Sequence, residues 1–206
     1  MEQVSAALLD WAMASAPLPG GEELGDVCLV RELPGAAVVA VVDGLGHGHE
    51  AARAARQALE LLERYIAEPP ASALRRCHEG LRSTRGVVAS VARFDAGRGT
   101  LTWIGVGNVM AVLQRSDARG RAPQESLLLG RGVVGRQLPP LRAAMLDVRP
   151  GDVLAMATDG IRPDFAPGVR ASAEPPQRIA DRILAEHQTG TDEALVAVVR
   201  YRGVDR

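Results

Sequence analysis

A run of five apolar residues, Val38–Val42, passes directly into a carboxylate and a glycine-rich turn, Asp43-Gly44-Leu45-Gly46-His47-Gly48. Small and β-branched residues in an unbroken run are typical of a strand buried on both faces. The glycines that follow allow the backbone to turn sharply. A strand of this kind holds the carboxylate of Asp43 in a fixed position, where it can ligate a metal ion.

A second segment repeats this pattern, because Val153–Thr158 runs into Asp159-Gly160. One Asp-Gly pair is usually only a turn, but two with the same apolar lead-in indicate a shared chemical role. Asp26 stands at the beginning of another expected strand, and Asp192 stands just before the last one. Carboxylates at strand ends are ligands that suit Mg²⁺ or Mn²⁺ rather than zinc.

The composition indicates one domain and excludes several classes of function. With 206 residues, 47% of them hydrophobic, the chain can form one sizeable core, so we expect a single domain over residues 1–206. A net charge of -1 gives no bulk attraction to nucleic acid or to an anionic membrane. All 24 basic residues are arginines, which excludes Schiff-base and P-loop lysine chemistry.

Neither a leader nor a disulfide framework is indicated. Asp10 interrupts the apolar stretch before Pro17, and no apolar run is long enough to span a membrane. Cys28 and Cys77 have no metal-binding spacing. We therefore expect a cytoplasmic protein.

The spacing of apolar residues predicts strands in hairpin-like runs, with helices between some of them. The expected strands are Gly25–Glu32, Ala36–Asp43, Val87–Phe94, Thr100–Gly105, Val109–Gln114, Ala143–Val148, Val153–Thr158 and Ala194–Tyr201. The expected helices are His49–Ile66, Ser72–Leu81 with Ser72 as its N-cap, and Pro175–His187. This order favours an α+β layered sandwich over a doubly wound parallel sheet.

Two regions between these elements have a weaker pattern. The turn Gly105-Val106-Gly107-Asn108 is interpreted as a hairpin within a meander, because no βαβ unit surrounds it as a nucleotide loop requires. The segment before it, Trp103-Ile104, is expected in the core. Ser116–Pro123 is a polar loop, and Leu127–Pro140 mixes apolar residues with glycines and arginines, so its structure is not assigned.

The ordered motifs resemble a known family. The motifs are Gly25-Asp26, Asp43–Gly48, Arg85–Ser90, Pro150–Gly160 and Asp192-Glu193. They are similar to those of the type 2C (PPM) metal-dependent Ser/Thr protein phosphatases, in the bacterial sporulation and stress-response branch. Asp43–Gly48 together with Trp103–Asn108 is most similar to the RsbX-type phosphatases that reset the stressosome. Each motif alone is weak, but they follow the family's order over nearly the whole chain.

This resemblance implies a four-layer α-β-β-α sandwich, with two packed antiparallel sheets and two divalent ions, Mn²⁺ or Mg²⁺, at one end. It assigns Asp43 as the bridging ligand, the Gly44 carbonyl as a further ligand, Asp159 and Asp192 as ligands of the second ion, and Asp26 as an additional ligand or a group that orients water. Asp43 and Asp159 are the residues implied in catalysis, in which metal-bound water attacks phosphoserine or phosphothreonine.

Three departures from the family pattern leave roles open. Leu45 stands where many larger members have a histidine that acts as general acid, and His47 either turns toward the site or caps the following helix. The N-terminal arginine that grips phosphate has no clear counterpart. Arg85, Arg131 and Arg136 could replace it, although a solvated role is favoured for each. Ala194-Leu195 follows Asp192-Glu193, so a hydroxyl common in the family is missing.

Three functions follow from these observations. The first is a phosphatase of a stress-signalling phosphoprotein, a stressosome scaffold or an anti-sigma antagonist, with no nucleic acid or membrane partner. The second is a phosphoprotein-binding module that kept the fold and lost turnover. The third is a phosphatase of the anti-anti-sigma factor in a partner-switching pathway. Four clustered aspartates argue against a pure binding module, since their mutual repulsion is relieved only by metal.

Overall fold

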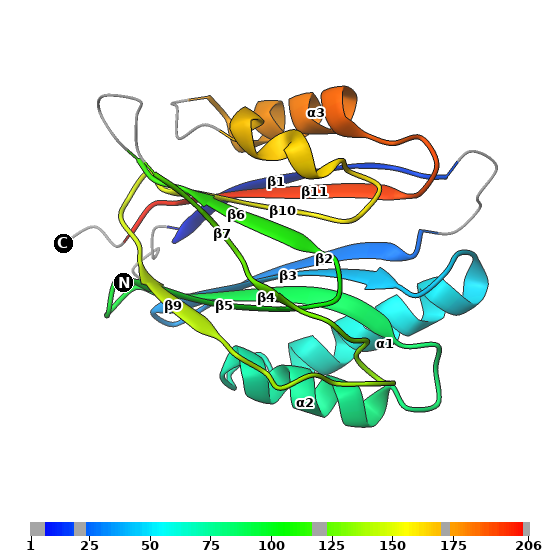
Figure 1. Cartoon of the computed structure of the whole chain (residues 1–206). Coiled ribbons are helices and arrows are strands. Elements are labelled where there is room, and N and C mark those ends of the chain that lie inside the picture. The colour runs from blue at the N-terminus through cyan, green and yellow to red at the C-terminus, as the bar shows by residue number, and fades with distance from the viewer. Residues whose placement is uncertain (1–6, 19–23, 117–122, 170–173, 204–206) are drawn as a thin grey trace, which may run out of the picture.

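Two β-sheets stack face to face, and helices cover both outer surfaces (Figure 1). The structure is a computed structural model that describes residues 7–18, 24–116, 123–169 and 174–203. Figure 1 shows α3 over one sheet and α1 and α2 over the other. The predicted α+β sandwich of four layers is therefore confirmed.

The first sheet has the strand order β1-β11-β10-β6-β7. Its strands are β1 (Leu9–Ala16), β11 (Ala194–Tyr201), β10 (Val153–Ala157), β6 (Met110–Gln114) and β7 (Gln124–Ser126). All neighbouring strands in this sheet are antiparallel. The helix α3 (Pro176–His187) and a 3-10 helix (Pro163–Gly168) belong to this half of the sandwich.

The second sheet has the strand order β2-β3-β4-β5-β8, and β9 also pairs with β5. Its strands are β2 (Asp26–Leu33), β3 (Ala36–Gly44), β4 (Val87–Asp95), β5 (Thr100–Val106), β8 (Leu129–Gly130) and β9 (Ala144–Asp147). The helices α1 (His49–Arg64) and α2 (Pro70–Gly80) pack on its outer face. Two strands pair with the outer edge of β5. The strand β9 pairs with the first half of β5, and β8 pairs with the end of β5.

The layers are held together by three sets of buried apolar side chains. Between the sheets, large residues such as Phe94, Trp103 and Met156 are almost completely buried. The helix α1 contacts its sheet through buried alanines, which allow a close approach, and α3 uses Ile179 and Ile183. Burial of Trp103 confirms the expectation that it belongs to the core. None of the described helices is long and apolar enough to cross a membrane.

The structure corrects the predicted meander. We expected β5 and β6 to pair across Gly107-Asn108, but β5 lies in one sheet, whereas β6 pairs with β10 and β7 in the other. The two residues therefore form a connection between sheets. A turn signal is local and does not specify which strand edge will accept the next strand, so the sequence could not distinguish the two arrangements.

Other local differences have simple causes. The strands β1 and β7 were not predicted, and β8 forms within Leu127–Pro140, the region whose structure was not assigned. Helix α2 begins at Pro70 rather than after Ser72, because proline is well suited to the first turn of a helix. Gly48 is the N-cap of α1 without a side-chain cap, so His47 does not have the capping role considered for it. Residues 117–122 of the expected polar loop lie outside the described residues.

Candidate metal centre

The four predicted aspartates come from strand ends on the same side of the sandwich. Asp26 at the start of β2 is directly opposite Asp43 at the end of β3 in the antiparallel ladder. Asp159 lies two residues beyond the end of β10, and Asp192 lies two residues before β11, which pairs with β10. The two sheets therefore each bring two carboxylates to this end.

A threonine that the sequence analysis did not single out joins the two halves of the site. The Thr158 hydroxyl donates a hydrogen bond to Asp26 Oδ2 at 2.7 Å, and it accepts one from the Leu195 N–H at 2.9 Å. Thr158 is completely buried. Its hydroxyl therefore fixes the Asp26 carboxyl and links β2 to the strand pair β10–β11.

Replacing this threonine tests that connection. Thr158→Val keeps the shape of the side chain but leaves the Asp26 carboxyl and the Leu195 N–H without this partner. We expect the free energy of unfolding to fall by about 1–3 kcal/mol, whereas Thr158→Ser retains the hydroxyl and loses less. Urea unfolding of both variants measures the difference. Equal losses in the two variants would show that packing of the methyl group, rather than the hydrogen bonds, accounts for the effect.

Glu193 has a structural role that the sequence analysis also missed. Its buried carboxylate accepts hydrogen bonds from the backbone N–H groups of Gly25 and Asp26. Charge-assisted bonds of this kind are stronger than neutral ones, so they hold the first residues of β2 against the start of β11. The sequence signal that could have indicated this role is the position of Glu193 immediately after Asp192.

The site is strongly unfavourable for unpaired negative charge. Burial, together with the neighbouring carboxylates, raises the pKa of Asp43 to about 8. Burial likewise raises the pKa of Asp26 to about 7, although the hydrogen bond from Thr158 opposes the shift. The pKa of Asp159 is raised by burial and by Asp192. A cation would remove this penalty, because an opposite charge favours the ionised carboxylate.

The donor set fits a divalent ion that prefers oxygen. Among the described residues, no three carboxylate, imidazole or thiolate groups lie close enough together to hold a metal ion as the side chains stand. The group nevertheless consists of acidic oxygens that interact electrostatically at one end of the fold. Mg²⁺ and Mn²⁺ accept such ligands and retain water in the remaining positions. The ligand assignments of Asp26, Asp43, Gly44, Asp159 and Asp192 stay predictions.

Two glycines of the Asp-Gly pairs allow the backbone segments of the site to approach closely. A Cβ on Gly44 would lie 2.2 Å from the Ala51 carbonyl oxygen, and a Cβ on Gly160 would lie 1.8 Å from that of Glu193. Either distance is far below a van der Waals contact. The glycines of the two pairs therefore bring the start of α1 against Asp43 and bring β11 against Asp159.

Asn108, in the turn that had been interpreted as a hairpin, contacts the site. Its side-chain amide donates to Asp159 Oδ2 at 2.6 Å. The turn itself is held because the Gly107 N–H donates to the Gly130 carbonyl at 2.9 Å. The connection between β5 and β6 therefore positions Asp159 and also links the site to the segment before β8.

One of the candidate arginines lies against the glycine-rich turn. A Cβ on Gly46 would be 3.1 Å from Arg85 Nη1, so the Arg85 guanidinium borders the turn that carries Asp43. The backbone supports this position, because the Leu45 N–H donates to the Gly86 carbonyl and Arg136 Nε donates to the Arg85 carbonyl. His47 is exposed on the same turn. Arg85 is itself exposed, which agrees with its interpretation as a solvated arginine, and it also lies beside this turn.

Residues 34–202 match the model of a protein family described as Stage II sporulation protein E (SpoIIE). The chain belongs to the SpoIIE family. The match includes every predicted site residue except Asp26, and it confirms the sequence-based resemblance to the sporulation and stress-response branch of the type 2C phosphatases. A curated relative, phosphoserine phosphatase RsbX of Bacillus subtilis (strain 168), is 33% identical over 76 residues. That alignment spans 37% of this chain and 38% of the relative.

Solved structures similar to this SpoIIE-family chain cover much more of its length than the curated relative does. One, from work on the bacterial stressosome as a modular system adapted to control secondary messenger signalling, has a TM-score of 0.84 and 29% sequence identity, covering 93% of this chain and 99% of that one. RsbX in complex with magnesium has a TM-score of 0.82 and 20% identity, covering 98% of both chains. At 20% identity, the similarity to RsbX shows that the two proteins share a fold.

Proposed function

We propose that this SpoIIE-family chain is a metal-dependent protein phosphatase that hydrolyses phosphoserine or phosphothreonine. The observation that carries the proposal is the group of electrostatically coupled aspartates, two from each sheet, at one end of a phosphatase fold. The resemblance to a phosphoserine phosphatase and to a magnesium-containing structure supports it. Buried carboxylates with raised pKa values are common at functional sites.

Two divalent ions, Mn²⁺ or Mg²⁺, would be held by Asp26, Asp43, Asp159, Asp192 and the Gly44 carbonyl. When bound, such ions supply positive charge that stabilises phosphoryl oxygens and makes water nucleophilic near neutral pH. The chain itself holds the carboxylates in place. Thr158 fixes Asp26 from the opposite sheet, and Asn108 fixes one oxygen of Asp159. Asp43 and Asp159 are the proposed catalytic residues.

Arg85 is the candidate for binding the phosphoryl group or an acidic residue beside it. Its guanidinium borders the turn that carries Asp43, and a planar fork of donors suits phosphate. We assign no general acid, since Leu45 has no ionisable group and none of the described hydrogen bonds directs His47 into the site.

The proposed substrate is a phosphorylated stress-signalling protein of the stressosome scaffold type, acted on in the cytoplasm. The subject of the related stressosome structure and the activity named for RsbX support this choice. Dephosphorylation of an anti-anti-sigma factor is the closest alternative. These candidates share the chemistry and differ only in the surface that presents the phosphorylated side chain.

Phosphate release with and without metal tests the proposal. We expect the protein to release phosphate from p-nitrophenyl phosphate and from phosphorylated stressosome proteins with Mn²⁺, and to stop when EDTA is added. Asp159→Asn should lower turnover by about 10²-fold or more, since it removes charge from the site. Asp147→Asn is a matched control, because Asp147 is an exposed aspartate on β9. Binding of phosphoprotein without any metal-dependent turnover would instead favour the phosphoprotein-binding module.

A further inference from the structure

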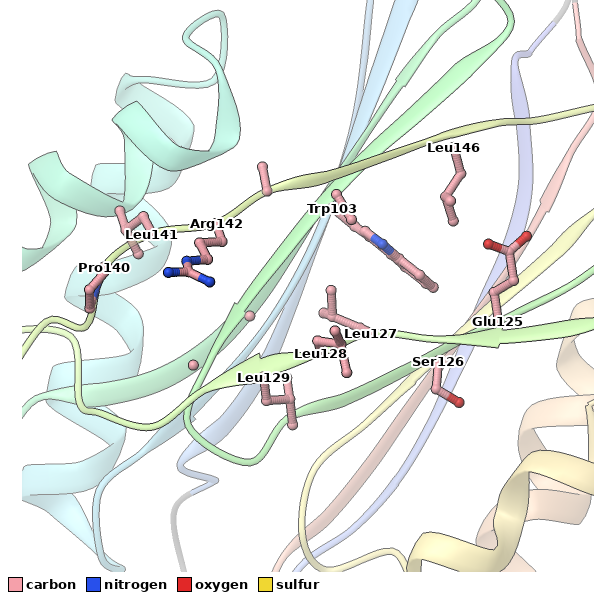
Figure 2. Close-up of a pocket in the computed structure, with 14 residues that line it drawn as sticks. Trp103, Glu125, Ser126, Leu127, Leu128, Leu129, Pro140, Leu141, Arg142 and Leu146 are labelled. Carbon is pink, nitrogen blue, oxygen red and sulfur yellow. The ribbon is translucent and has the colours of Figure 1, made fainter.

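A cavity lies along the edge of the sandwich, apart from the aspartate group. It has a volume of about 490 Å³ and is lined by the middle of β5, the segment from β7 to β8, and the segment leading into β9 (Figure 2). Figure 2 shows Trp103 at its centre, with Leu127, Leu128 and Leu129 on one side and Pro140, Leu141 and Arg142 on another. The cavity exists because β8 and β9 share the outer edge of β5 and diverge between their paired segments.

The lining combines apolar surface with one uncompensated positive charge. Leu128 is 90% exposed, an unusual position for a leucine that lines a cavity. The acidic residue of the lining, Glu125, forms an ion pair with Arg115, which it shares with the buried Asp152. Arg142 has no hydrogen-bond or ion-pair partner among the described residues, and in Figure 2 its guanidinium lies beside the cavity. The cavity therefore has the chemistry to receive an apolar group with a negative charge next to it.

The cavity is connected to the metal centre by a short segment of backbone. Gly105 and Gly130 both line it, and Gly130 accepts the hydrogen bond of Gly107, which precedes Asn108. Asn108 in turn donates to Asp159. The connection that positions Asp159 therefore also borders the cavity.

We propose that this cavity is a docking site for the phosphoprotein substrate, which inserts an apolar side chain that has an acidic neighbour. The proposal rests on the proposed phosphatase function and adds a determinant of substrate choice. The apolar side chain covers Leu128, and the acidic neighbour pairs with Arg142. Small phosphate esters do not reach the cavity, so its occupation affects protein substrates alone.

Three variants alter the cavity in different ways. Leu128→Asp removes apolar surface and adds a negative charge, Arg142→Glu reverses the positive charge, and Ala144→Phe fills the space. All three residues are exposed, so the substitutions leave the core unchanged. Met145→Ala is the control for apolar truncation, because Met145 is 67% exposed on β9 but does not line the cavity. Arg75→Glu, at an exposed arginine of α2, is the control for charge reversal.

The first measurement uses a small probe and requires no catalysis. The dye 8-anilinonaphthalene-1-sulfonate combines apolar rings with one negative charge, so it matches the chemistry of the cavity. We expect it to bind the wild type and both control variants, and to lose about tenfold in affinity with Ala144→Phe and Arg142→Glu. Equal dye affinity in all variants would overturn the assignment of the cavity as a binding site.

The second measurement compares substrates. We expect Leu128→Asp and Arg142→Glu to raise KM for the phosphorylated scaffold about tenfold, with unchanged turnover of p-nitrophenyl phosphate. Unchanged KM for the scaffold would overturn docking, even with dye binding intact, and would indicate a small-molecule site. A parallel loss with both substrates would also overturn it. If wild type hydrolyses neither substrate, the phosphatase proposal fails, and docking is then judged from the scaffold's dissociation constant in the same variants.

Discussion

Asp43→Asn is expected to abolish metal-dependent phosphate release and, at the same time, to stabilise the protein in the absence of metal. The substitution removes a carboxylate whose pKa is raised to about 8 by burial and by neighbouring acids. Turnover should fall by about 10³-fold or more, because the residue proposed to bridge the ions is lost. In EDTA at pH 8, the free energy of unfolding should rise by about 2 kcal/mol, since an unpaired buried charge is removed.

The pH dependence gives this prediction a definite sign. A carboxyl group whose pKa is higher in the folded state than in the unfolded state stabilises the fold at low pH and loses that contribution as pH rises. For Asp43 the loss extends from about pH 4 to about pH 8. The stabilisation by Asp43→Asn in EDTA should therefore be largest at pH 8 and should fade toward pH 4. A variant that is less stable than wild type at pH 8 in EDTA would contradict the account.

Gly160→Ala is expected to have the largest effect on stability. The added Cβ would lie 1.8 Å from the Glu193 carbonyl oxygen, and this oxygen belongs to backbone that cannot rotate away. Separating the two segments should lower the free energy of unfolding by about 3 kcal/mol or more and the melting temperature by about 10 °C. The displacement also moves Asp159 relative to Asp192, so metal-dependent turnover should fall as well.

Gly97 is a control glycine. It distinguishes the effect of the steric clash at Gly160 from the general effect of adding a methyl group. A Cβ on Gly97 would be 3.5 Å from its nearest neighbour, an ordinary contact, and Gly97 does not have a positive φ angle. Gly97→Ala should therefore change the melting temperature little. Thermal unfolding of both variants checks the prediction, and similar melting temperatures for them would show that the backbone at Gly160 tolerates a side chain.

The sequence was sufficient to predict a layered α+β sandwich and the strand ends at which the four aspartates stand. Buried strands have a simple signature, and Val38–Val42 and Val153–Ala157 are indeed strands of the two different sheets. The Asp-Gly pairs that follow them mark both strand ends. Because each prediction depended on residues close together in the chain, local physical chemistry was enough to make it.

Pairing between distant segments was not predictable in this way. Nothing local indicates that the hydroxyl of Thr158 reaches Asp26, 132 residues away, or that Glu193 accepts bonds from the start of β2. For the same reason, the turn before Asn108 was interpreted as a hairpin, although it leads from one sheet to the other. These contacts depend on how the two sheets are stacked, which periodicity along one strand does not reveal.

Calorimetric titration of Mn²⁺ into the wild type and into Asp43→Asn tests the central claim most directly. The account predicts that the wild type binds two ions per chain and that Asp43→Asn loses this binding, in parallel with its loss of phosphate release. The absence of Mn²⁺ binding to the wild type, together with phosphate release that continues in EDTA, would contradict it.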